Sequence, residues 1–108
     1  MASDLDLKRE VKKILNLIKS EVPGKSVELR VPPYGAIQCV AGSNHRRGTP
    51  PNTVEMSGQT LIRLINEPSL WITLCESGEV RASGLLGDLS NIFTQAAVKY
   101  RPNNLDLA

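Results

Sequence analysis

The chain has 108 residues, enough for one domain with a modest hydrophobic core, and a second independent domain is implausible. An apolar fraction of 41% and a charged fraction of 22% are typical of a globular protein and argue against wholesale disorder. The net charge of +2 is mixed along the chain and is too weak to predict nucleic acid as a partner.

The short apolar runs, the acidic first residues and the contexts of the cysteines predict a cytoplasmic protein. The apolar runs are shorter than the roughly 20 residues of a membrane-spanning helix, and the acidic start differs from a signal peptide. Cys39 and Cys75 stand in unrelated contexts, without a CxxC pair or the Cys and His spacing of a zinc site. Each is typical of a small buried hydrophobe in a reducing compartment, and a disulfide between them remains an open alternative.

Residues 4–21 carry apolar side chains at helical spacing and predict an amphipathic helix. Ser3 or Asp4 fits its first turn, and Pro23 and Gly24 end it. The opposite face carries basic side chains: Lys8, Arg9, Lys12, Lys13 and Lys19. This pattern favours a solvated outer face, and the alternative is transient contact with an anionic membrane surface.

Residues 26–31 alternate apolar and polar side chains, which predicts a strand with one covered face. Residues 32–35, Pro-Pro-Tyr-Gly, then predict a turn, and residues 36–41 a second strand of a β-hairpin. Because the alternation of the second strand is blurred, a central strand covered on both faces is the alternative. In that case Gln38 would need a buried partner.

Residues 42–52 are polar, lack periodicity and predict a loop that concentrates His45, Arg46 and Arg47. The loop fails as a phosphate loop because no lysine follows Gly48 and two prolines prevent an immediate helix. Its guanidinium groups suit a lipid head group, a carboxylate or a phosphate. The structural alternative is that they anchor the loop on backbone carbonyls or on Glu55.

The second half of the chain alternates short elements. Residues 53–56 predict a strand, Ser57 caps a helix over 58–66, and Ser69 caps a further short helix that ends at Gly78. Residues 70–75 also suit a strand, because Trp, Ile and Thr favour sheet.

A strand over 79–84 precedes the final helix, which Asp88 caps. That helix has a regular apolar stripe in which Ala96 and Ala97 leave room for close packing or for a ligand chain. We expect a short tail after about residue 101.

Several of these stretches resemble a known family. Residues 69–84, followed by Asp-Leu-Ser at 88–90, are similar to the part of sterol-carrier-protein-like domains in which a short helix ends in Ser-Gly before a strand and the final helix. Pro-Pro-Tyr-Gly at 32–35 and Arg-Gly-Thr-Pro-Pro-Asn at 47–52 resemble the bacterial, mainly actinobacterial, branch of that family. The similarity spans roughly residues 26–93.

The resemblance implies an α/β (α+β) sandwich over the single domain 1–108: a mainly antiparallel sheet of four to five strands with helices packed on one face. It implies a helix for residues 70–75 and an apolar cavity between the layers. Family members bind fatty acyl chains, acyl-coenzyme A, sterols or phospholipids without converting them. The chain is short for the family, which is consistent with a missing strand and a smaller or closed cavity.

The residues give little support to catalysis. His45 is the only histidine, and no carboxylate or nucleophile stands at a fixed offset from it to suggest a triad or a general base. No cluster of metal ligands is visible. We therefore expect no enzyme, no cofactor and no metal.

The sequence and the resemblance together predict a cytoplasmic, non-catalytic protein that binds a lipid or another apolar small molecule. The expected cavity residues are Leu61, Leu64, Leu70, Trp71, Leu74, Phe93 and Ala96, and the expected head-group residues are Gln38, His45, Arg46 and Arg47. The main alternative is a module of the same fold with a filled core that binds a partner protein or itself as a homodimer. A further alternative is a subunit that recognises a phosphate-bearing small molecule through residues 42–52.

Overall fold

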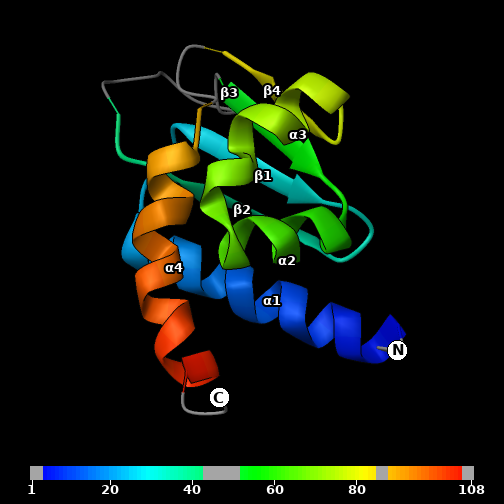
Figure 1. Cartoon of the computed structure of the whole chain (residues 1–108). Coiled ribbons are helices and arrows are strands. Elements are labelled where there is room, and N and C mark those ends of the chain that lie inside the picture. Colours follow the sequence, from blue (N-terminus) through cyan, green and yellow to red (C-terminus); the bar gives the residue numbers. More distant parts are fainter. Residues whose placement is uncertain (1–3, 43–51, 85–87, 106–108) are drawn as a thin grey trace.

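The structure is a computed structural model that describes residues 4–42, 52–84 and 88–105 (Figure 1). In chain order its elements are α1 (Asp4–Glu21), β1 (Val27–Val31), β2 (Gly35–Cys39), β3 (Asn52–Met56), α2 (Gly58–Asn66), the short 3-10 helix η1 (Pro68–Leu70), α3 (Trp71–Ser77), β4 (Val80–Ser83) and α4 (Ser90–Leu105). Residues 70–75 are therefore helical, as the resemblance implied.

The four strands form one mixed sheet in the order β2-β1-β3-β4. β1 pairs antiparallel with β2, and β3 pairs antiparallel with β4. The two central strands, β1 and β3, run parallel, with Leu29 in register with Val54. This arrangement confirms the predicted fold class of a mainly antiparallel sheet with helices on one face.

The strands divide their side chains between the two faces of the sheet with a period of two. Val27, Leu29 and Val31 of β1 are fully buried on the inner face, together with Val54 of β3. The alternate side chains point to the other face, which the helices leave open, and include Glu28, Arg30, Thr53 and Glu55. Figure 1 shows the helices gathered on one side of the sheet. The inner face is therefore the only one that contributes to the core among the described residues.

The helices pack on one another as well as on the sheet. α1 begins and ends where the sequence predicted, and Ser57 caps α2 by accepting a hydrogen bond from the amide of Thr60. The Tyr100 hydroxyl of α4 donates to the Glu10 carboxylate of α1, and the Lys13 ammonium lies 5.6 Å from the Tyr100 ring centroid. These contacts fix α4 against α1.

Asn52 is a buried polar residue that joins the beginnings of the two central strands. Its side-chain amide donates to the carbonyl of Ser26 over 2.8 Å, which satisfies both buried groups. Gly84 packs directly against it, because a Cβ at Gly84 would lie 2.0 Å from Asn52 Oδ1. Gly84 also has φ +96, a conformation that glycine adopts without a steric penalty.

Several sequence predictions are wrong in detail. β1 and β2 form the predicted hairpin, but the alternative of a central strand is wrong, because β2 is an edge strand and Gln38 is only half-buried. Ser69 makes no capping bond, because η1 begins at Pro68 and leads directly into α3. α4 continues through Pro102 to Leu105, beyond the expected start of a tail.

The two cysteines form no disulfide. Cys39 is buried, as expected, whereas Cys75 is only half-buried. No helix among the described residues is long and apolar enough to cross a membrane.

Candidate functional site

The residues expected to line a cavity meet in the layer between the helices and the sheet. Leu61, Leu64, Leu74, Phe93 and Ala96 have at most 1% of their surface exposed, and Trp71 has 5%. Leu70 is half-buried and packs against this cluster. The structure thus brings all seven together in one apolar layer, in which they are packed on one another. Their role in ligand binding remains a prediction.

An aromatic pair lies in this layer where α3 faces α4. The rings of Trp71 and Phe93 have their centroids 6.1 Å apart, with an interplanar angle of 34°. Tilted pairs at such distances are favourable aromatic contacts, worth about 0.5–1.5 kcal/mol beyond the burial of the rings. Trp71 therefore reports directly on whatever separates α3 from α4.

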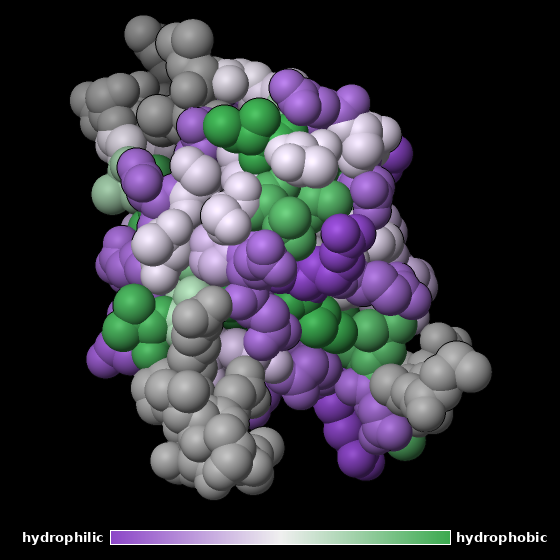
Figure 2. All heavy atoms as spheres, in the orientation of Figure 1, coloured by the Kyte–Doolittle hydropathy of each residue, from purple (hydrophilic) through white to green (hydrophobic). Residues whose placement is uncertain are grey.

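A groove reaches this layer from outside. The η1–α4 groove has a volume of about 440 Å³ and is lined by Glu67, Pro68, Ser69, Thr94, Ala97 and Val98. Ala97 belongs both to the groove and to the hydrophobic core, so the small side chain connects the two. Val98 lies at the rim and is 66% exposed. Figure 2 shows apolar atoms reaching the surface over α3 and beside α4. The pair of alanines in the last helix was the sequence signal for this site.

Of the four expected head-group residues, Gln38 alone lies in the described part of the structure. Gln38 lies opposite Glu28 on β1, on the open face of the sheet and away from the apolar layer. His45, Arg46 and Arg47 lie outside the described residues. Glu55, the alternative anchor for the two arginines, accepts a hydrogen bond of 2.7 Å from Arg81, and its contact with Arg46 or Arg47 stays a prediction.

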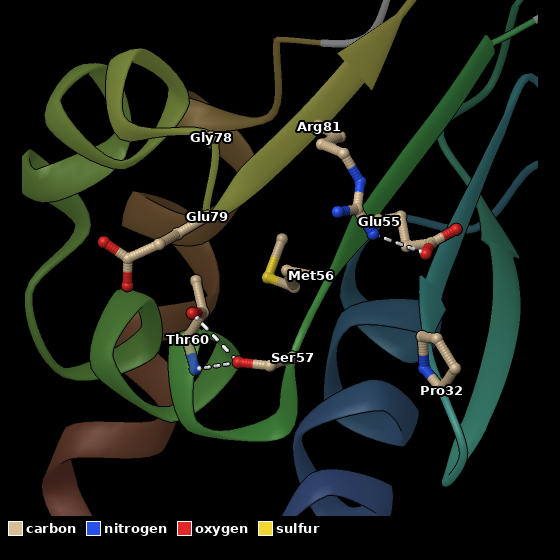
Figure 3. A pocket seen from close by; sticks show the side chains of 8 residues that line it. All are labelled: Pro32, Glu55, Met56, Ser57, Thr60, Gly78, Glu79 and Arg81. Atoms are coloured by element: carbon tan, nitrogen blue, oxygen red, sulfur yellow. Dashed lines mark hydrogen bonds and ion pairs between the residues drawn. The ribbon is translucent and has the colours of Figure 1, made fainter.

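A second, polar hollow opens where β3 ends and β4 begins (Figure 3). The β3–β4 pocket has a volume of about 350 Å³ and is lined by Pro32, Glu55, Met56, Ser57, Thr60, Gly78, Glu79 and Arg81. Sequence analysis missed it, because the residues come together only through the order and register of the strands.

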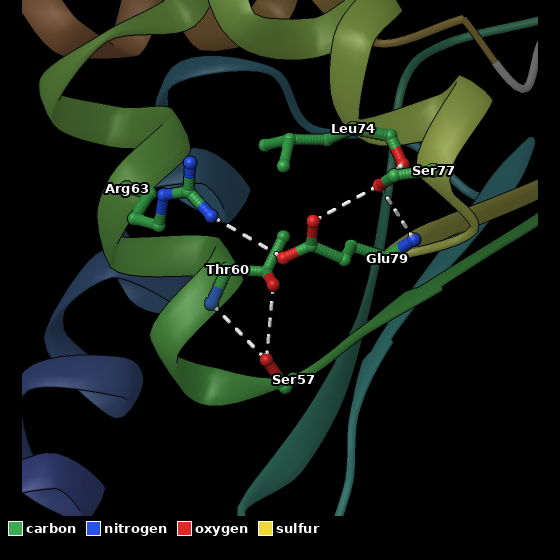
Figure 4. Close-up of polar contacts among 6 residues, drawn as sticks. All are labelled: Ser57, Thr60, Arg63, Leu74, Ser77 and Glu79. Carbon is green, nitrogen blue, oxygen red and sulfur yellow. Dashed lines mark hydrogen bonds and ion pairs between the residues drawn. The ribbon is translucent and has the colours of Figure 1, made fainter.

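The carboxylates of the β3–β4 pocket both face an arginine. Arg81 pairs with Glu55 at 2.7 Å, and Arg63 of α2 pairs with Glu79 at 3.2 Å. The Ser77 hydroxyl lies 3.0 Å from both a Glu79 carboxylate oxygen and the Leu74 carbonyl and shares its one proton between them (Figure 4). The pair of Glu79 with Arg63 ties the turn between α3 and β4 to α2. These side chains are largely exposed, and such pairs contribute little to stability. Each carboxylate of the pocket thus has a cationic partner, Arg81 within the lining and Arg63 beside it.

Both thiols are held in the protonated form. Burial raises the pKa of the Cys39 thiol from its ordinary 9.0 to about 11. Burial also raises the pKa of Cys75, and the negative charges of Asp88 and Glu76 add to that effect. Because the thiolate is the nucleophilic form, neither cysteine is activated for nucleophilic attack near neutral pH. Among the described residues, no three His, Cys, Asp or Glu side chains gather in a way that could hold a metal ion.

Comparison with known proteins places this geometry in a family. The model of the family described as bacterial SCP ortholog matches residues 4–94. The fold is similar to that of a solved structure titled UbiJ-SCP2 ubiquinone synthesis protein, with a TM-score of 0.51 and 17% sequence identity, over 91% of this chain and 94% of that chain. At this identity the likeness shows the fold alone. No curated protein matches the chain.

Proposed function

Because the chain belongs to the bacterial SCP ortholog family, we propose that it binds a lipid or another apolar small molecule and releases it unchanged. The ligand classes are those that the family resemblance implies: a fatty acyl chain, an acyl-coenzyme A or a sterol-like molecule. The proposed setting is the cytoplasm, and no cofactor takes part.

The observation that carries this proposal is the position of Ala97. It lines the η1–α4 groove and also belongs to the hydrophobic core formed with Phe93 and Ala96. A ligand chain lying in the groove therefore needs only a small separation of α4 from η1 to reach apolar side chains throughout the layer. Removing apolar surface from water supplies about 25 cal/mol per Å², so the driving force grows with the length of chain inserted. The groove volume of about 440 Å³ lies within the range of small-molecule sites, roughly 300–1,000 Å³.

Native mass spectrometry of the purified full chain, followed by lipid extraction, tests the proposal. We expect an apolar species to co-purify and a fluorescent fatty acid to be taken up with quenching or enhancement of Trp71 emission. An apo mass with no uptake of the fatty acid, of a long-chain acyl-coenzyme A or of a sterol would contradict it.

A matched pair of variants tests whether the ligand lies in the η1–α4 groove. Ala97→Leu narrows the groove and should weaken uptake. Gln95→Leu adds the same side chain to an exposed position of α4 that is absent from the groove lining, and should leave uptake unchanged. Equal effects of the two variants would show that the ligand is held elsewhere.

The head-group role is tested separately. If His45, Arg46 and Arg47 hold an anionic head group, Arg46→Ala and Arg47→Ala should lower the affinity for a fatty acid. The affinity for an uncharged fatty alcohol of the same length should fall less. Unchanged affinity for the acid would leave the arginines with a structural role.

A filled-core interaction module is the second candidate, and the close packing of the inner layer favours it. Leu61, Leu64 and Phe93 have no exposed surface. If no ligand enters, lipids should neither bind nor raise the melting temperature. Sedimentation analysis then distinguishes two cases. Self-association would indicate a homodimer, and a monomer would indicate a module that binds a different protein.

A further inference from the structure

In the part of the chain that the structure describes, the outer edge of β2 pairs with no other strand and is a second feature with binding potential. β2 stands at the end of the sheet, and β1 is its only strand neighbour in the described part of the chain. An edge strand presents unpaired backbone N–H and C=O groups, which form a template for another strand. Along β2, Gly35 and Ala36 are exposed, Ile37 and Gln38 are half-buried, and Cys39 is buried.

A hollow lies beside this edge, where α1 passes β2. The α1–β2 cleft has a volume of about 230 Å³ and is lined by Lys12, Leu15, Asn16, Tyr34, Gly35, Ala36 and Ile37. Leu15 and Ile37 supply apolar surface, whereas Lys12 and Asn16 supply polar groups. The volume is below the roughly 300–1,000 Å³ of sites for drug-sized molecules, so the cleft suits a single side chain better than a whole ligand.

The charge beside the cleft is positive. Lys12 is exposed, and Lys8 lies one turn away on the same side of α1, where it is exposed too. The ion pairs found among the described residues join Arg30, Arg63 and Arg81 to glutamates and leave these lysines out. The edge therefore offers backbone pairing, an apolar hollow and a cation within one short stretch.

We infer that the α1–β2 cleft binds an extended acidic segment of a partner protein, which adds a strand to the edge of β2. Main-chain hydrogen bonds supply affinity in this mode of recognition, and pockets for alternate side chains supply specificity. One bulky apolar side chain fills the hollow, and a carboxylate two positions away, on the same face of the added strand, meets Lys12. The cleft shares no lining residue with the η1–α4 groove, so the inference does not depend on lipid binding.

The test begins with a displayed library of random linear peptides selected on the purified full chain. We expect enrichment of sequences in which a carboxylate lies two positions from a bulky apolar residue, because side chains two apart share a face of a strand. A fluorescein-labelled synthetic copy of the enriched peptide then gives the affinity by fluorescence anisotropy.

Two variants probe the chemistry of the cleft. Lys12→Glu should lower the affinity for the peptide by about fivefold or more, which is the effect of one exposed charge pair. Lys19→Glu makes the same charge change about 10 Å further along α1. Because this distance is near the screening length in salt, the affinity for the peptide should fall by less than about twofold. Gly35→Leu should fill the hollow and abolish binding. A Cβ at Gly35 lies 3.6 Å from Leu15 Cδ1, an ordinary contact, so the backbone at this position accepts a side chain.

Amide hydrogen exchange identifies the strand addition itself. The bound peptide should slow exchange within Gly35–Cys39 and leave α3 unchanged. Three results would each overturn the inference: no enrichment above an unrelated protein, equal binding by Lys12→Glu and Lys19→Glu, or protection that appears only outside β2. Circular dichroism and the melting temperature verify that each variant is folded.

Discussion

The indole of Trp71 and the ring of Phe93 face each other across 6.1 Å and join α3 to α4 within the apolar layer. Phe93 is fully buried and is among the largest such side chains of the core. The contact between the two rings therefore depends on how closely α3 packs on α4, and Trp71 fluorescence should change if that packing changes.

Truncation of this pair should be costly. We expect Phe93→Ala to lower the free energy of unfolding by about 3–5 kcal/mol, because the apolar contacts are lost and a cavity remains. Val98→Ala on the same helix, at a position 66% exposed, should change it by less than about 0.5 kcal/mol. Urea denaturation of both variants measures the difference, and equal losses would show that α4 does not pack on α3 as described.

Two glycines with left-handed backbone angles should differ sharply in their tolerance of alanine. Gly78→Ala, at φ +85 with no atom within 4 Å of the new Cβ, should cost only the conformational penalty of about 1–2 kcal/mol. Gly84→Ala places its Cβ 2.0 Å from Asn52 Oδ1 and should cost clearly more, because the buried Asn52 must move away from Ser26. Melting temperatures compare the two, and a milder effect at Gly84 would contradict the packing of Asn52.

Capping separates two serines that look alike in sequence. Ser57→Ala should destabilise the protein by about 1 kcal/mol, since the amide of Thr60 loses its side-chain acceptor. Ser69→Ala should be nearly neutral, because Ser69 is exposed and caps neither η1 nor α3. If Ser69→Ala lowers the stability as much as Ser57→Ala, Ser69 acts as the cap that the sequence predicted.

Stability should fall in alkaline solution because of Cys39. Its thiol has a pKa of about 11 in the folded chain against an ordinary 9.0, so the unfolded chain releases the proton first as the pH rises. The contribution is fully present below pH 9, decreases between about 9 and 11 by at most about 1.4 kcal/mol per pH unit, and is lost above that range. Denaturation of wild type and Cys39→Ala at several pH values measures it. Equal slopes for the two proteins would exclude Cys39 as the cause.

Local signals predicted the elements of this fold well. The apolar periodicity located α1 and α2, and alternation located β1, because each pattern reflects which face of the element meets the core. Ser69 misled because a proline one residue earlier began a 3-10 turn in place of a capped helix. The position of β2 at the sheet edge depended on long-range pairing, which no local pattern encodes.

The candidate site was predictable to a similar extent. The apolar stripes identified residues that gather in one layer, and Ala96 with Ala97 marked the place where a groove meets it. The β3–β4 pocket had no sequence signal, since Glu55 and Arg81 are far apart in the chain and meet only through strand register. The role expected of His45, Arg46 and Arg47 stays a prediction.

The parallel pairing of β1 with β3 has a consequence for the order of folding. The β1–β2 hairpin closes over a short turn, and its loop-closure entropy is small. The centre of the sheet forms only when β3, which follows β2 along the chain, docks on the opposite side of β1. Contacts that are distant in sequence slow folding. The chain is therefore expected to form its hairpin early and to reach its transition state when β3 joins β1, so substitutions at Val54 should slow refolding more than substitutions at Ile37.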